Sequence, residues 1–164
     1  MDPDNRHKSY SRYFPASVRD RKRGWYVTTA GEMRILPGQE YPPSRNPKGY
    51  NFNWNKGRAL ESHALVYISR GRGSFESQHS ALQPIEAGQV VFLFPGVWHR
   101  YRPGSETGCD EHWVGFDGDV TRRWLKRQFF SPQMPVFKPG QEEKWLTLFT
   151  ELIAIIKLNR PALQ

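Results

Sequence analysis

The 164-residue sequence contains a single cysteine, Cys109. One cysteine cannot form an intramolecular disulfide, and a chain of this length buries enough apolar surface to fold without one. Its longest apolar runs, 90–95 and 152–156, are far shorter than the roughly 18 to 20 residues that span a bilayer. The N-terminus MDPDNRHKSY is charged and no apolar stretch follows it, unlike a secretory signal. We therefore expect a cytoplasmic protein without a membrane segment.

Acidic residues are outnumbered, with 16 Asp and Glu against 24 Lys and Arg and a net charge of +8. The excess is spread, because residues 1–24, 25–72 and 119–164 each carry +4 while residues 73–118 carry −4. Neither a helix-turn-helix pattern nor a helical face rich in Lys and Arg is present. The basic run RDRKRG at 19–24 is expected to be solvated surface. We therefore expect no direct DNA binding by this chain.

Groups suited to covalent or phosphate chemistry are also scarce. Cys109 precedes Asp110 and Glu111, whose negative charges raise the pKa of a thiol and oppose formation of a reactive thiolate. We expect an inert thiol in a loop. The sequence GRGSF at 71–75 has no strand-to-helix context, so it indicates a hairpin turn and no phosphate cradle. The sequence thus predicts no catalytic residue, no cofactor and no enzyme activity.

What the sequence does contain is a series of short β-rich segments between residues 25 and 116. Clusters of Gly, Pro, Asn and Ser separate them, and turns are expected at 37–38, 45–47, 71–73 and 103–104. Many short strands with such turns are typical of a sandwich or barrel. Strands are predicted at 25–30, 32–36, 50–54, 63–69, 73–77, 82–85, 90–94, 98–101 and 111–116.

The segments on either side of this region differ from it. Residues 1–24 are polar and basic and are expected to form an N-terminal arm, followed by a barrel at 25–118. Beyond it, residues 119–164 change to helical periodicity and are expected to form a dimerisation or linker segment. Asp119 is the predicted N-cap of a helix over 120–130.

The last predicted helix covers 141–158 and is amphipathic. Its apolar positions follow the i, i+3, i+4, i+7 spacing of one buried face. Such a stripe requires an apolar partner, which is either the barrel of the same chain or a second subunit. The stripe consists of Trp145, Leu148, Phe149, Leu152, Ile155 and Ile156.

The most informative stretch lies between residues 84 and 104, PIEAGQVVFLFPGVWHRYRPG. Gly88 ends one turn and Pro95-Gly96 makes a second. His99 and Tyr101 then follow at a spacing of two, so both side chains are expected on the same face of one strand. This arrangement resembles the second motif of the cupin superfamily.

Two further stretches extend the resemblance, RALESHALVYISRGRGSF at 58–75 and DEHWVGFDG at 110–118. In order and spacing, residues 25–160 resemble the N-terminal effector-binding and dimerisation domain of the arabinose-regulator (AraC/XylS) family of transcription factors. The resemblance implies a mainly β fold, a cupin-type double-stranded β-helix (a small β-barrel or jelly roll) followed by C-terminal α-helices. It also implies non-catalytic binding of a small-molecule effector, with a sugar expected, and a homodimer formed by the C-terminal helices. DNA would be bound only through a helix-turn-helix domain that we expect to be absent from this chain, unless the protein is a stand-alone sensor.

By position against the family pattern, Arg58, Tyr101 and Trp113 lie where arabinose-binding relatives contact the sugar. An Arg offers five donors to vicinal hydroxyls, a Trp face covers the C–H side of a sugar ring, and a Tyr hydroxyl donates and accepts. The alternatives are a solvated surface charge for Arg58 and a plain core role for Trp113. Met33 also matches a pocket-lining position.

Glu111 stands where those relatives place a histidine. A carboxylate accepts sugar hydroxyls strongly but repels an acidic effector unless Arg58 neutralises it. Glu111 is therefore predicted either to bind the ligand or to form a salt bridge with Arg58. His99 is predicted either to bond a ligand hydroxyl or to be a neutral imidazole satisfied inside the barrel.

A cupin metalloenzyme, such as a sugar isomerase or a dioxygenase, is the alternative function. Many cupins bind a metal through a His-x-His pair and a later Glu in the first motif, together with the histidine of the second motif. This sequence has no His-x-His pair. His63 and His99 alone leave a metal short of the three or four protein ligands of a catalytic site, so no metal is predicted.

Overall fold

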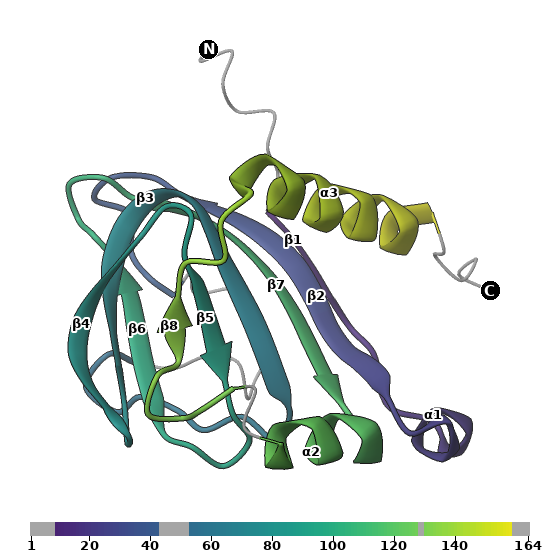
Figure 1. Cartoon of the computed structure of the whole chain (residues 1–164). Helices are drawn as coiled ribbons and strands as arrows, with labels where there is room; N and C mark the ends of the chain where they lie inside the picture. Colours follow the sequence, from purple (N-terminus) through teal and green to yellow (C-terminus); the bar gives the residue numbers. More distant parts are fainter. Residues whose placement is uncertain (1–8, 43–52, 128–129, 159–164) are drawn as a thin grey trace.

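The computed structural model describes residues 9–42, 53–127 and 130–158, and its centre is a β-barrel (Figure 1). The predicted fold class is confirmed: the chain is mainly β, with its longest helix at the C-terminal end of the described residues. None of the described helices is long and apolar enough to cross a bilayer. The elements are β1 (Tyr10–Tyr13), α1 (Val18–Arg23), β2 (Tyr26–Ile35), β3 (His63–Ser77), β4 (Ser80–Glu86), β5 (Val90–Leu93), β6 (His99–Pro103), β7 (Cys109–Asp117), α2 (Asp119–Lys126), β8 (Val136–Phe137) and α3 (Glu142–Leu158).

The long strand β3 belongs to both sides of the barrel. Its first half, from His63 to Gly71, pairs with β7 and β5 in an antiparallel sheet of order β1-β2-β7-β3-β5-β8. Its second half, from Arg72 to Ser77, pairs with β4 and β6. The change occurs next to a register shift between Ile68 and Arg70, where the strand bends. One strand therefore joins the two sheets that enclose the barrel interior.

Side chains of β3 alternate between the interior and the outer face of its sheet. Ala64 and Ile68 belong to the interior cluster that also contains Phe75, Ile85 and other buried residues. Tyr67, between them, faces outward and packs against Phe149 of α3. Because both faces are covered, this part of β3 is apolar at successive positions and does not alternate with polar residues.

The predicted turn at 71–73 is wrong, because β3 runs through it and joins the strands predicted at 63–69 and 73–77. Gly71 has φ of +80°, and a Cβ there would lie 2.1 Å from the Gly108 carbonyl oxygen. It thus allows a bend and a close approach to β7. Similarly, the strands predicted at 25–30 and 32–36 are one strand, β2. Gly31 lies within this strand, and its lack of a side chain leaves room for the Trp113 ring.

The residues expected to form an arm contribute a strand to the barrel's sheet. Tyr10–Tyr13 pair antiparallel with β2, and α1 follows with Ser17 and Asp20 forming a capping box. Of the strand predicted at 50–54, residues 50–52 lie outside the described residues, and Asn53 and Trp54 lie in a turn region.

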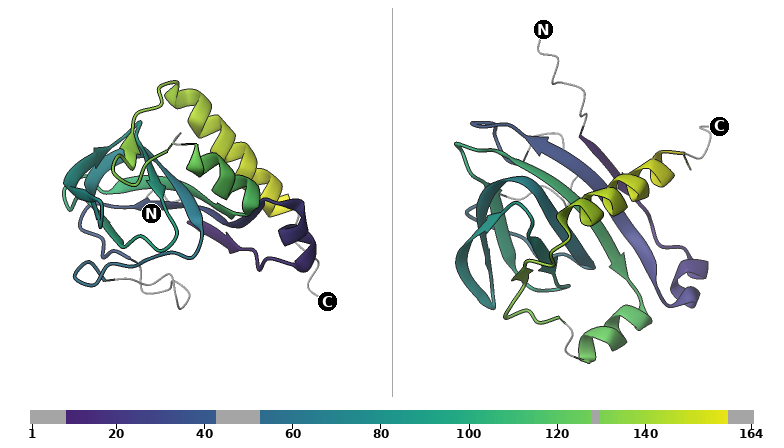
Figure 2. Two further views of the ribbon diagram at one scale, coloured as in Figure 1. Left: turned by 60° about the horizontal axis from the view of Figure 1, so that its bottom comes forward. Right: turned by 45° about the horizontal axis from the view of Figure 1, so that its top comes forward.

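Helix α3 lies across the outer face of the sheet, over β2 and β3 (Figure 2). Its buried residues are Phe149, Ile153 and Ile156, the last two packed on Ala30. Of the predicted stripe, Leu148 and Ile155 are exposed in the single chain, because the helix faces the sheet about 149 and 153. The barrel of the same chain thus takes one apolar face of α3.

Helix α2 is shorter than predicted and begins differently. Gly118, with φ of +130°, is its N-cap, whereas Asp119 was predicted in that role and is the first helical residue. Trp124, on this helix, is exposed. Cys109 was expected in a loop, but it is the first residue of β7 and is fully buried.

A matched pair of glycine substitutions tests the bend in β3. Gly71→Ala combines a left-handed backbone with a clash against β7, so we expect it to lower the free energy of unfolding by about 3 kcal/mol or more. Gly96→Ala meets the same backbone cost, since φ is +72°, but open space, and is expected to lose only about 1 kcal/mol. Urea unfolding of both variants measures the difference. Equal losses would contradict the packing role of Gly71.

Candidate functional site

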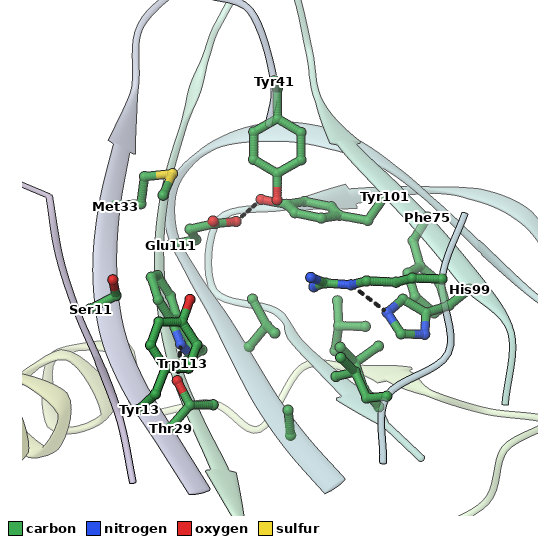
Figure 3. Close-up of a pocket in the computed structure, with 16 residues that line it drawn as sticks. Ser11, Tyr13, Thr29, Met33, Tyr41, Phe75, His99, Tyr101, Glu111 and Trp113 are labelled. Atoms are coloured by element: carbon green, nitrogen blue, oxygen red, sulfur yellow. Dashed lines mark hydrogen bonds between the residues drawn. The ribbon is translucent and has the colours of Figure 1, made fainter. Parts of the chain in front are cut away.

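A cavity of about 80 Å³ opens inside the barrel. All six residues singled out from the sequence line it (Figure 3), and they come from three strands and the segment before β3. These residues are Met33 from β2, Arg58 ahead of β3, His99 and Tyr101 from β6, and Glu111 and Trp113 from β7.

The spacing of two explains why the strands deliver these residues in pairs. His99 and Tyr101 point into the same cavity from β6, as predicted, and Glu111 and Trp113 do so from β7. The two strands do not pair with each other, and each pairs with a different half of β3. The cavity is therefore the space between the two sheets that β3 joins.

Arg58 and His99 are held together by backbone and side-chain bonds. Each residue donates its backbone N–H to the other's carbonyl oxygen, at 2.9 and 2.8 Å. Arg58 Nε donates to His99 Nε2 at 3.3 Å, so Nε2 is an acceptor and the ring proton lies on Nδ1. His99 Nδ1 then donates to the Val97 carbonyl oxygen at 3.2 Å. The solvated-surface interpretation of Arg58 is wrong, because its side chain is half-buried at the cavity wall.

The His99 ring is neutral. Burial lowers its pKa to about 4, and the positive charge of Arg58 contributes in the same direction. Both ring nitrogens have protein partners, so His99 positions the Arg58 side chain. Of the two predictions for His99, the neutral imidazole with both nitrogens bonded inside the barrel agrees better with this arrangement.

Glu111 is the buried acid of the cavity. It accepts a hydrogen bond from the Tyr101 hydroxyl. Burial raises the pKa of Glu111 to about 8, although the nearby Arg58 charge opposes this shift. The Tyr41 ring meets the Tyr101 ring edge-on, with centroids 5.2 Å apart, and burial and Glu111 raise the pKa of Tyr41 well above 10. At neutral pH Glu111 is therefore mainly protonated and the repulsion of acidic ligands expected from its charge is largely removed.

Trp113 lies at the β1 side of the cavity. Its indole N–H donates to Thr29 Oγ1 at 3.3 Å, and the ring packs over Gly31. The half-buried ring also lines the cavity, and ligand binding by Trp113 stays a prediction. Ser11 and Tyr13, on β1, line the same side.

Sequence reasoning missed several lining residues. Ser11 and Tyr13 were assigned to an arm, because a four-residue edge strand has too short a pattern to be recognised. Tyr41 follows the turn at 37–38 and carries no sequence signal at all. Thr29 lies four residues before Met33 on β2 and so on the same face, but the predicted break at Gly31 placed the two residues on separate strands.

The floor of the cavity is apolar. Six of its sixteen lining residues carry only hydrocarbon side chains, and none of these offers a hydrogen bond to a ligand. They come from the segment before β3 and from β3 and β5. They are Leu60, Ala64, Val66, Phe75, Val91 and Leu93.

The described residues do not assemble a metal site. Across 9–42, 53–127 and 130–158, no three His, Cys, Asp or Glu side chains come together. His63 is not near His99 in the cavity: its ring stacks on Phe116, with centroids 5.9 Å apart, and burial lowers its pKa. Because His99 uses both nitrogens within the protein, it offers no lone pair to a metal in this conformation.

Glu111 makes stability depend on pH in a defined window. The folded state holds the proton up to about pH 8, whereas the unfolded carboxyl releases it near its ordinary pKa of 4.5, so stability falls as pH rises between these values. The lowered pKa of His99 acts oppositely below about pH 6.5. From pH 6.5 to 8 we expect the free energy of unfolding to fall by about 2 kcal/mol more in the wild type than in Glu111→Gln. Urea unfolding at both pH values measures this, and parallel curves would contradict it.

Comparison with known proteins identifies a family. Residues 37–163 match the family model of the AraC-like ligand binding domain. No curated protein matches the sequence.

Several solved structures are similar to this chain at low sequence identity. The protein YhaK from Escherichia coli is 13% identical with a TM-score of 0.49, covering 79% of this chain and 49% of its own, so the chain spans about half the length of that structure. A Cupin 2 conserved barrel domain protein from Salinispora arenicola is 19% identical (TM-score 0.40; 73% of this chain, 84% of that chain). Oxalate decarboxylase from Bacillus subtilis is 17% identical (TM-score 0.41; 90% of this chain, 31% of that chain).

Proposed function

Since the chain belongs to the family of AraC-like ligand binding domains, we propose that it is a regulatory domain that senses a small-molecule effector and does not transform it. The observation that best supports this function is one partly enclosed cavity whose polar groups already bond one another. A binding site needs such fixed donors and acceptors. Burial raises the pKa of Cys109 to about 12, which makes its thiol inert.

A sugar remains the effector predicted from the sequence. Tyr101 and Glu111 offer hydroxyl and carboxyl groups to a polyol, and the Trp113 face suits the apolar side of a sugar ring. His99 enters this proposal as a positioning residue for Arg58.

Strand β1 supplies a route from the cavity to α3. Ser11 and Tyr13 line the cavity, while the alternate residue Arg12 donates from Nη1 to the Ile156 carbonyl oxygen at 2.9 Å. Tyr10 and Phe14 pack against Ile153 and Ile156 on the same side. A ligand that shifts β1 would therefore change how α3 is held.

The outer face of α3 supports a homodimer. Leu148 and Ile155, seven residues apart, lie on one helix face and are more than half exposed. An exposed apolar face of this kind suits a second copy of the same helix. In this proposal effector binding changes the dimer, and this change alters the arrangement of a separate DNA-binding domain. The protein is proposed to act in the cytoplasm.

Ligand binding at the cavity is testable with two tryptophan variants. We expect a thermal-shift screen of sugars, sugar acids and aromatic acids to find a ligand that raises the Tm. Trp113→Leu is expected to lower the affinity for that ligand about tenfold or more, because it removes a wall of the cavity. Trp124→Leu, at an exposed position on α2, is the matched control and should bind as the wild type. Equal affinities in both variants would place the ligand elsewhere.

Dimerisation is tested at the exposed face of α3. Leu148→Lys combined with Ile155→Lys is expected to convert a dimer to a monomer in sedimentation velocity, because the charges would be buried unpaired. Leu82→Lys, at an exposed leucine on β4, controls for added charge. A double variant that sediments as the wild type would exclude this face as the interface.

A further inference from the structure

We propose that the effector of this cavity carries a carboxylate, which binds to the guanidinium of Arg58. The inference rests on the proposed sensing function and narrows its ligand class. It departs from the sequence-based expectation that Glu111 disfavours acidic ligands. A sugar acid and an acid with an apolar body share this chemistry, and the experiment below separates them.

The charges on the cavity wall favour an anion. Among the sixteen lining residues, all in the described part of the chain, Arg58 is the one lysine or arginine and Glu111 the one acidic residue. Glu111 is 5% exposed and accepts the Tyr101 hydroxyl, so its carboxyl is already engaged inside the protein. With Glu111 protonated and His99 neutral, the wall carries one net positive charge at neutral pH.

Arg58 is held in place for this role. Two backbone bonds to His99 fix its main chain, and the bond from Nε to His99 Nε2 fixes the plane of the guanidinium. A guanidinium fixed in this way loses little conformational freedom when it binds a carboxylate, and its fork matches the two oxygens. His99, stacked on Phe75 with centroids 6.4 Å apart, is itself fixed.

The apolar floor strengthens this interaction and limits the alternatives. Hydrocarbon walls lower the local dielectric, so a charge pair inside the cavity is stronger than one in water. Those hydrocarbon side chains offer no partner to any hydroxyl of a neutral polyol that lies against them, and each such hydroxyl that loses its water costs affinity. A ligand with one anionic group and a compact remainder therefore fits this lining better than a neutral sugar.

Glu111 makes the preference depend on pH. The groups that face its carboxyl are Tyr41, Tyr101, Arg58 and, on its own strand, Cys109. The pKa of Tyr41 lies well above 10 and that of Cys109 is about 12, so neither changes charge below pH 9. Between pH 7 and 9 Glu111 is the group among these that becomes negative, and it then repels a bound carboxylate.

Calorimetric titration with two matched pairs, each to millimolar concentration at pH 7, tests the proposal. Benzoate and benzamide share an apolar body, and galacturonate and galactose share a sugar body. If the cavity accepts the benzene ring, we expect benzoate to bind about tenfold to hundredfold more tightly than benzamide. If it accepts the sugar ring, we expect the same difference between galacturonate and galactose. The pair that binds shows which kind of acid the cavity accepts.

Variants assign the preference to Arg58. Arg58→Gln should abolish the difference between acid and neutral compound, while Arg58→Lys should retain part of it. Arg102→Gln is the control, because Arg102 lies on β6, the strand of His99, but stacks on Trp54 and does not line the cavity. Raising the pH from 7 to 9 should lower the affinity for the acid by up to about tenfold in the wild type, and should leave it unchanged in Glu111→Gln.

The outcomes separate this inference from the proposed function. Neutral compounds that bind as tightly as the acids, or an acid preference that survives in Arg58→Gln with an unchanged Tm, would overturn the carboxylate proposal and leave a sensing domain. Failure of all four compounds and of the wider thermal-shift screen to bind the folded wild type would overturn both.

Discussion

The shared strand β3 is the constraint on which the rest of the barrel depends. Its first half pairs with β7 and β5 and its second half with β4 and β6, so the two sheets cannot separate without breaking one continuous strand. The close approach of Gly71 to Gly108 allows the bend between the halves. The cavity exists because this bend holds β6 and β7 on opposite walls.

Inside that enclosure, burial determines the chemistry. In water Glu111 would be an anion at neutral pH, but the barrel removes its hydration and Tyr101 replaces it with one hydrogen bond. His99 loses its proton for the same reason and becomes an acceptor for Arg58. Glu111 and His99 are therefore neutral. Arg58 keeps its charge, and His99 orients its guanidinium.

The outer face of the same sheet carries the second requirement of a sensor, a connection to the rest of the molecule. Residues 10 to 14 alternate between the cavity and α3, because successive side chains of a strand point to opposite faces. Lys157 extends this contact by lying over the Tyr10 ring and pairing with Glu32. A short edge strand thus contacts the cavity with one side and α3 with the other.

The sequence by itself determined the local structure: the mainly β class, the strand–turn pattern at 84–104, and the inward pairs His99 with Tyr101 and Glu111 with Trp113. These follow from a period of two and from turn chemistry, which act over a few residues. Only the tertiary structure decided that 71–73 continues a strand, that β1 completes the cavity wall, and that Phe149 and Ile153, rather than Leu148 and Ile155, face the barrel. It also decided that Glu111 is protonated and that Arg58 meets His99, 41 residues away. Pairing and desolvation between distant segments set these properties, and no local pattern carries that information.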